Sequence, residues 1–157
     1  MTDTPNNTLD NDALHEVIQT IDKSLDDCFD QAKQLAQEFT DFRLLSLNER
    51  PTMDMLWLML YVNRRPDGTI YIYWRRARNS YVRDGAKRVI SDHLPKPRSG
   101  PYRPSTLKSH SPPWSHETVL DTEVRAQHIR ESAAALNTAR RALLAVTPDL
   151  SYQESED

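Results

Sequence analysis

Residues 55–78 restrict the fold more than any other stretch, because their pattern predicts a β-hairpin. Two runs rich in β-branched and aromatic residues flank Pro66-Asp67-Gly68. Proline fixes φ for a turn and glycine accepts positive φ, so this tripeptide is typical of a tight connection between antiparallel strands. The first run, residues 55–62, is apolar at every position. Since both faces of such a strand need cover, we expect it to be a central strand.

A long helix is predicted before the hairpin. Apolar residues recur at alternating steps of four and three, which places them on one stripe of a helix. The stripe consists of Leu14, Ile18, Ile21, Leu25, Cys28, Ala32, Leu35, Phe39 and Phe42. It is either the seam of a coiled coil or a face laid against another long helix. Asn11 or Asp12 can cap this helix, which should end before Pro51.

A second long helix is predicted between Ser115, a suitable N-cap residue, and Val146, just before Pro148. Residues 87–91 are expected to add a third strand after the hairpin. The chain therefore predicts an α+β fold in which long N- and C-terminal helices pack together on one face of a small antiparallel sheet.

The length of 157 residues fits one domain, which we place at residues 11–147. The polar residues 1–10 are expected to form a disordered lead-in, and residues 148–157 an acidic flexible tail. Residues 95–113 contain six of the ten prolines together with several cations. This composition predicts an extended, basic, Pro-rich loop.

No run approaches the roughly 20 apolar residues that cross a bilayer, and the N-terminus lacks a signal-peptide pattern. A cytoplasmic protein without membrane contact is therefore expected. The single cysteine, Cys28, lies on the apolar helical stripe and is expected to be a core residue.

Charge is distributed unevenly, although the net charge is only −3. Residues 1–54 carry 12 acidic and 4 basic residues, residues 55–114 carry 3 and 12, and residues 115–157 carry 8 and 4. A basic middle third is the footprint of a polyanion-binding site. The alternative is that the acidic helices neutralise the basic sheet within the fold.

The candidate nucleic-acid-binding residues are the cations of this middle third: Arg75, Arg76, Arg78, Arg83, Lys87, Arg88, Arg98, Arg103 and Lys108. Cations displace counterions from phosphates, and arginine forks can read guanine edges. The last three either follow a phosphate backbone or serve only solubility. Trp57, Trp74 and Tyr61 are expected to fill the core.

Catalysis, metal binding and cofactor binding are not expected. None of the five histidines pairs with another ligand at a spacing typical of zinc sites. The three glycines, Gly68, Gly85 and Gly100, are too far apart for a phosphate-binding loop. A tyrosine nucleophile among the arginines would want a metal or a histidine cluster nearby.

The order of features is similar to a known family. It comprises a long amphipathic N-terminal helix, the hairpin segments Leu56-Trp57-Leu58 and Ile72-Tyr73-Trp74-Arg75, the segment Gly100-Pro101-Tyr102-Arg103, and a helix with Glu123 and Ile129-Arg130. Over roughly residues 14 to 146 the chain resembles the MobI-type conjugative transfer proteins. The resemblance implies a non-enzymatic auxiliary factor that acts with a relaxase at the origin of transfer of a plasmid or integrative element. It offers no catalytic residues to carry over.

Two other functions are compatible with the same sequence features. One is a protein-interaction module or transcriptional regulator of a mobile element, a homodimer formed through the N-terminal helix. The other is an RNA-binding protein. Palindromic site preference would favour the regulator, and preference for single strands would favour RNA binding.

Overall fold

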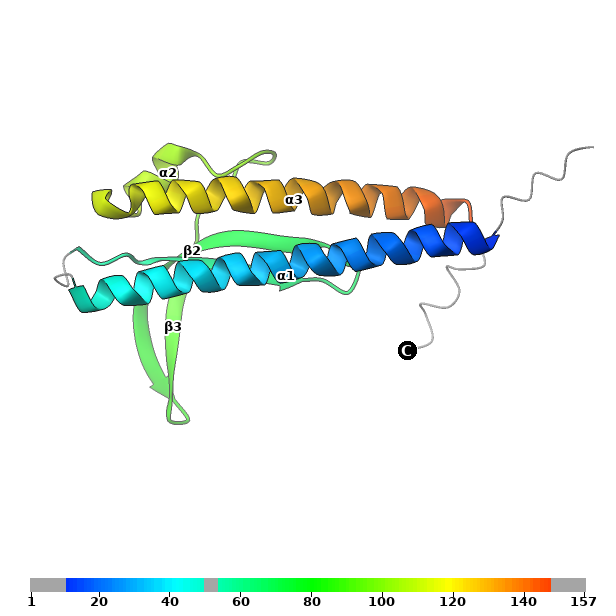
Figure 1. The fold of residues 1–157 in the computed structure, drawn as a ribbon. Helices are drawn as coiled ribbons and strands as arrows, with labels where there is room; N and C mark the ends of the chain where they lie inside the picture. Colours follow the sequence, from blue (N-terminus) through cyan, green and yellow to red (C-terminus); the bar gives the residue numbers. More distant parts are fainter. Residues whose placement is uncertain (1–10, 50–53, 148–157) are drawn as a thin grey trace, which may run out of the picture.

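The computed structural model describes residues 11–49 and 54–147 (Figure 1). Its long elements are the helices α1 (Asn11–Glu49) and α3 (His116–Ala145) and the strands β1 (Leu58–Arg64), β2 (Ile70–Arg83) and β3 (Ala86–His93). The short helix α2 (Pro104–Ser109) and the 3-10 turn η2 (Pro113–Ser115) precede α3. The α+β class is thus confirmed. The expected lead-in and acidic tail, residues 1–10 and 148–157, lie outside the described residues.

The two long helices lie side by side and cover one face of the sheet (Figure 1). Six residues of the predicted stripe on α1 are buried: Ile18, Leu25, Cys28, Ala32, Leu35 and Phe39. Their partners lie on α3 and on the sheet of the same chain. The stripe is therefore a face laid against another helix, and a dimer would have to use other residues.

The sheet has the order β1-β2-β3, with antiparallel pairing throughout. The prediction that the first run is a central strand was wrong, because β2 is central and β1 forms an edge. Leu58 and Leu60 face the helices and are buried, whereas Tyr61 on the other face is 36% exposed. An aromatic side chain with a polar group, such as tyrosine, can lie on a half-exposed face of a sheet. An unbroken apolar run therefore did not require that both faces of the strand be buried.

Trp74 lies at the centre of the core, where its ring is fully buried. It packs edge to face against Phe39 of α1, with the ring centroids 4.9 Å apart. Its indole Nε1 donates to the carboxylate of Glu123 on α3. Trp74 thus joins the sheet to both helices, as its predicted core position required. Trp57 and Tyr61 were wrongly assigned to the core, since they are 40% and 36% exposed.

Glu123 is a buried acid that accepts four hydrogen bonds from three elements. Besides Trp74, the backbone N–H of Tyr102 donates to Oε1 at 2.8 Å, and the guanidinium of Arg130 donates to both carboxylate oxygens. Arg130 also donates from Nε to the carbonyl oxygen of Ile72. The ion pair is buried, and its polar atoms are satisfied by this network, as a buried charge requires.

The Pro-rich segment is not the extended loop that its composition predicted. Leu107, in α2, is fully buried, and the Tyr102 side chain is 2% exposed. The hydroxyl of Tyr102 accepts a hydrogen bond from the backbone N–H of Trp74. Pro104 lies at the first turn of α2, where a missing N–H costs nothing. A few apolar anchors therefore fold a segment that has no apolar period.

Ser115 occupies the predicted N-cap position of α3, but its hydroxyl does not cap the helix. It donates instead to the carbonyl oxygen of Pro112. The third strand is confirmed and is longer than expected, at Ala86–His93.

Candidate nucleic-acid interface

The outer parts of β2 and β3 form a two-stranded ribbon over residues 78–92, which is the candidate interface. Register pairs Tyr81 with Arg88 and Val82 with Lys87. Asp84 and Gly85 close the turn with φ values of 51° and 77°. Positive φ at both positions is what a type I′ hairpin turn requires, and this turn matches the twist of the strands.

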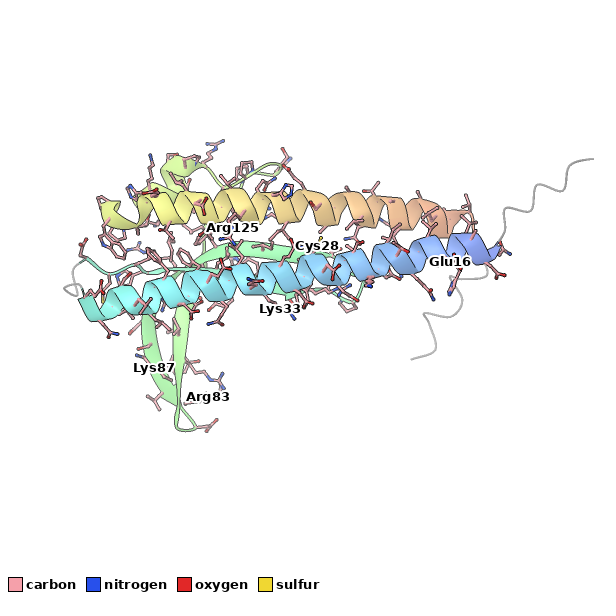
Figure 2. The ribbon with its side chains drawn as sticks, viewed as in Figure 1. Glu16, Cys28, Lys33, Arg83, Lys87 and Arg125 are labelled. Atoms are coloured by element: carbon pink, nitrogen blue, oxygen red, sulfur yellow. The ribbon has the colours of Figure 1, made fainter. Side chains whose placement is uncertain are left out.

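The ribbon stands clear of the rest of the fold (Figure 1). Every residue from 78 to 90 is exposed. Figure 2 shows Arg83 and Lys87 close to its end, on the side of α1 away from α3. The pairing of β2 with β3 shifts between Ala77 and Asn79, and such a bulge bends a strand. The bulge thus marks the place where β2 leaves the packed sheet and enters the ribbon.

The two faces of the ribbon differ in chemistry. Tyr81, Arg83 and Arg88 share one face, because paired residues and residues two apart lie on the same side of a ladder. Val82, Lys87 and Val89 occupy the other face by the same rule. One face therefore offers two guanidinium groups and a phenol, and the other offers an ammonium beside two apolar side chains.

Part of the positive charge of the ribbon is compensated. At its base, Arg78 Nε lies 2.5 Å from a carboxylate oxygen of Asp92, and Arg83 Nε lies 4.0 Å from one of Asp84. Within the described ranges 11–49 and 54–147, Lys87 and Arg88 form no ion pair. Among the ribbon cations, these two are the most available to an external anion.

Arg75 and Arg76 lie in the packed part of the sheet and not in the ribbon. The guanidinium of Arg75 donates to the carbonyl oxygen of Ser91 at 2.6 Å and lies over the ring of Tyr61. The exposed Arg76 lines a shallow pocket with Trp57 and the loop before α3. Arg75 therefore supports the sheet, so substituting it would also perturb the fold.

Arg98, Arg103 and Lys108 are exposed, but they belong to the segment that leads into α2 and to α2 itself. Helix α2 lies beside α3, whereas the ribbon projects beyond α1 (Figure 1). The structure therefore does not bring the nine predicted residues together on one surface. One group lies on the ribbon, which projects beyond α1, and another lies on and before α2, which is beside α3 (Figure 1).

Sequence reasoning missed a second surface, which we call the open face: the side of β1, β2 and β3 that faces away from the helices. Its rings include Tyr61, Tyr71, Tyr73 and His93. The rings of Tyr61 and Tyr73 stack with centroids 5.8 Å apart, and Tyr73 and His93 stack at 4.8 Å. Strict alternation of these residues with Leu60, Ile72 and Trp74 was the signal that could have revealed it.

No group of three or more His, Cys, Asp or Glu residues that could hold a metal ion occurs in the part of the chain that the structure describes. Within the same ranges, every helix is too short or too polar to cross a bilayer. The single cysteine is buried, and burial, with a smaller effect of Asp27, raises the pKa of the Cys28 thiol.

The family model of the MobI protein matches residues 28–144, which is well over half of the chain. The chain belongs to the MobI family. The match extends from the middle of α1 to the last turn of α3, so the MobI region includes the ribbon, the open face and the buried Glu123 network. The resemblance noted from the order of features is thus confirmed. Neither the curated proteins nor the solved structures that were searched gave a match.

Membership of the MobI family associates this chain with conjugative mobilisation. The match names no ligand and no site residue. The chemistry of the ribbon and of the open face follows from their own side chains.

Proposed function

We propose that this protein is a non-enzymatic, DNA-binding auxiliary factor of conjugative transfer that acts at the origin of transfer together with a relaxase. The observation that carries the proposal is the ribbon, whose exposed cations stand clear of the fold. Membership of the MobI family indicates the process, conjugative mobilisation, and the exposed cations of the ribbon provide groups that can contact DNA.

A two-stranded β-ribbon fits the major groove of duplex DNA, where each base pair presents a distinct pattern of donors and acceptors. The face with Arg83 and Arg88 offers planar guanidinium forks that match the O6 and N7 atoms of guanine. Lys87 on the opposite face is free to neutralise a phosphate. The ribbon thus combines groups for base contact with groups for backbone contact.

Internal neutralisation does not account for the charge of the ribbon. The acidic residues of α1 and α3 lie on the helix pair, and every residue of the ribbon from 78 to 90 projects into solvent. The ion pairs of the ribbon cations in the described residues involve Asp84 and Asp92, which belong to the ribbon itself. The remaining cations therefore favour a partner outside the chain.

The test compares two triple variants that each remove three exposed cations. The ribbon variant is Arg83→Ala, Lys87→Ala and Arg88→Ala. The α2 variant is Arg98→Ala, Arg103→Ala and Lys108→Ala. Binding to duplex DNA carrying the transfer origin is measured over a series of salt concentrations, with random-sequence duplex as the reference.

The log of the affinity should fall with log salt by about 0.9 for each phosphate contacted. The ribbon variant should bind more weakly and show a shallower slope, while the α2 variant should keep the wild-type slope. Equal losses in both variants would mean that the ribbon has no special role. Absence of any salt-dependent binding by the wild type would refute DNA binding altogether.

The relaxase part of the proposal has its own experiment. Relaxase from the same mobile element is added to the transfer-origin duplex with and without this protein. Tighter or more specific relaxase binding in its presence supports an auxiliary role. A relaxase footprint that does not change argues for the regulator alternative instead.

A further inference from the structure

We propose that the open face binds single-stranded DNA by stacking unpaired bases on its aromatic rings. This inference rests on the proposed DNA-binding function and deepens it by naming the form of DNA that this surface takes.

The register of the sheet creates a row of rings on the open face. Tyr61 lies directly opposite Tyr73, and Arg75 lies directly opposite His93. The rings of Tyr61, Tyr73 and His93 therefore form a continuous stack across all three strands. His93, at the β3 end of this stack, is exposed and offers a place where a base can extend it.

Cations border the rings. The guanidinium of Arg75 lies 5.6 Å from the ring centroid of Tyr61, and that of Arg65 lies 4.5 Å from the ring centroid of Tyr71. Arg65 is exposed, so its guanidinium can reach a phosphate beside a base that stacks on the neighbouring ring. Arg75 is half-buried and adds positive charge at the β2 strand.

The open face carries no acidic residue in the described strands. Its residues are Met59, Tyr61, Asn63, Tyr71, Tyr73, Arg75, Ala77, Ser91 and His93. Cross-strand aromatic pairs also stabilise sheets, which would explain one pair of rings. Stabilisation of the sheet would not explain a third ring, two bordering arginines and the absence of carboxylates on the same surface of the described strands.

The chemistry of this surface selects an unpaired strand over a duplex. Bases in a duplex hide their ring faces against one another, whereas unpaired bases can stack on aromatic side chains. A sheet with exposed rings and flanking cations is one of the recurring ways in which proteins hold single strands. The open face also continues into the base of the ribbon through β2 and β3, so one DNA molecule could contact both surfaces at a junction between duplex and single strand.

The experiment measures binding of labelled oligodeoxythymidine to three variants. The variant Tyr61→Leu with Tyr73→Leu removes two rings and keeps apolar side chains on the sheet. The variant Tyr61→Phe with Tyr73→Phe keeps the rings and removes only the hydroxyls. The ribbon variant described above serves as the third protein. Urea unfolding of each variant shows that the fold persists.

Stacking is worth enough per base that losing it should weaken binding about tenfold or more. The leucine variant should show this loss for oligodeoxythymidine and keep its affinity for duplex DNA, and the phenylalanine variant should bind like the wild type. The exposed end of the stack gives a second test that leaves the buried sheet untouched, because His93→Ala should also weaken binding to the single strand.

Failure of this inference can be told apart from failure of the proposed function. Duplex binding that depends on the ribbon, together with single-strand binding that does not depend on the rings, would overturn the inference and leave the proposed function intact. If the wild type bound neither duplex nor single-stranded DNA, both the inference and the proposed function would be overturned. Ring-dependent binding to oligouridine with higher affinity than to oligodeoxythymidine would overturn the assignment to DNA.

Discussion

The indole Nε1 of Trp74 donates a hydrogen bond to Oε2 of Glu123 at 2.7 Å, across 49 residues of sequence. The same carboxylate forms an ion pair with Arg130, whose side chain is only 9% exposed. Sheet, α3 and the segment before α2 therefore meet at one buried acid.

Replacing this acid with its amide should destabilise the protein strongly. In Glu123→Gln the Arg130 guanidinium stays buried without an anionic partner, which typically costs about 3–5 kcal/mol of unfolding free energy. Urea denaturation measures the change. The exposed ion pair between Glu38 and Arg125 provides the control, since Glu38→Gln should cost at most about 1 kcal/mol. Similar losses of unfolding free energy in the two variants would mean that burial does not make the Glu123–Arg130 ion pair more important for stability than the exposed pair.

The packing of the Pro-rich segment predicts a large effect for Leu107→Ala. This side chain is fully buried, and such truncations cost about 2–5 kcal/mol. The neighbouring Lys108 is exposed, and Lys108→Ala should change stability by less than about 0.5 kcal/mol. Thermal or urea unfolding of the two variants gives the comparison. A negligible effect of Leu107→Ala would restore the prediction of a loose loop.

The turn of the ribbon predicts a local effect for Gly85→Ala. Gly85 has a φ of 77°, where a Cβ costs about 1–2 kcal/mol, although no atom within 4 Å would clash with it. Amide hydrogen exchange in the ribbon should accelerate by about tenfold, while exchange in α1 and α3 stays unchanged. Gly100, with a φ of 82° and equally open surroundings, is the matched control. Faster exchange in the ribbon of Gly100→Ala would show that the effect is not local.

The buried cysteine predicts a specific dependence of stability on pH. Burial raises the pKa of Cys28 above that of the unfolded chain, so the folded state prefers the neutral thiol. The buried neutral thiol therefore contributes fully to the unfolding free energy below the pKa of the unfolded chain, about 8.5. This contribution is lost as the pH rises through the pKa of Cys28 in the folded state. The urea midpoints of wild type and Cys28→Ala are measured at pH 7 and at pH 9.5. The difference between the two midpoints should be smaller at pH 9.5 than at pH 7. Alkylation of Cys28 should be slow in the folded protein and fast in urea.

Periodicity was enough to predict both long helices, the hairpin and the α+β class. Alternating steps of three and four identified the buried face of α1, and Pro66-Asp67-Gly68 identified the turn between β1 and β2. These signals are local, because each depends on residues that are neighbours in the sequence.

Long-range relationships were not predictable in the same way. Leu107 and Tyr102 are isolated apolar residues in a Pro-rich segment, and their burial depends on elements that are distant in the sequence, α3 and, for Tyr102, also β2. The edge position of β1 depends on β3 pairing with β2, which no feature of residues 55–62 could indicate. The two groups of cations were separated by the bend of β2 at Ala77, and a linear list of basic residues contains no information about that bend.

The exposure of residues 78–90 has a consequence for how such a protein can change over time. None of these side chains takes part in the core, so substitutions outside the turn residues Asp84 and Gly85 should have little effect on the stability of the fold. If the ribbon binds the transfer origin, as proposed, a mobile element that acquired a different transfer origin could alter the ribbon without changing the core of the domain. Exchanging residues 78–92 between two such proteins should then transfer the preference for a DNA site. The helix pair and the packed sheet should accept either ribbon.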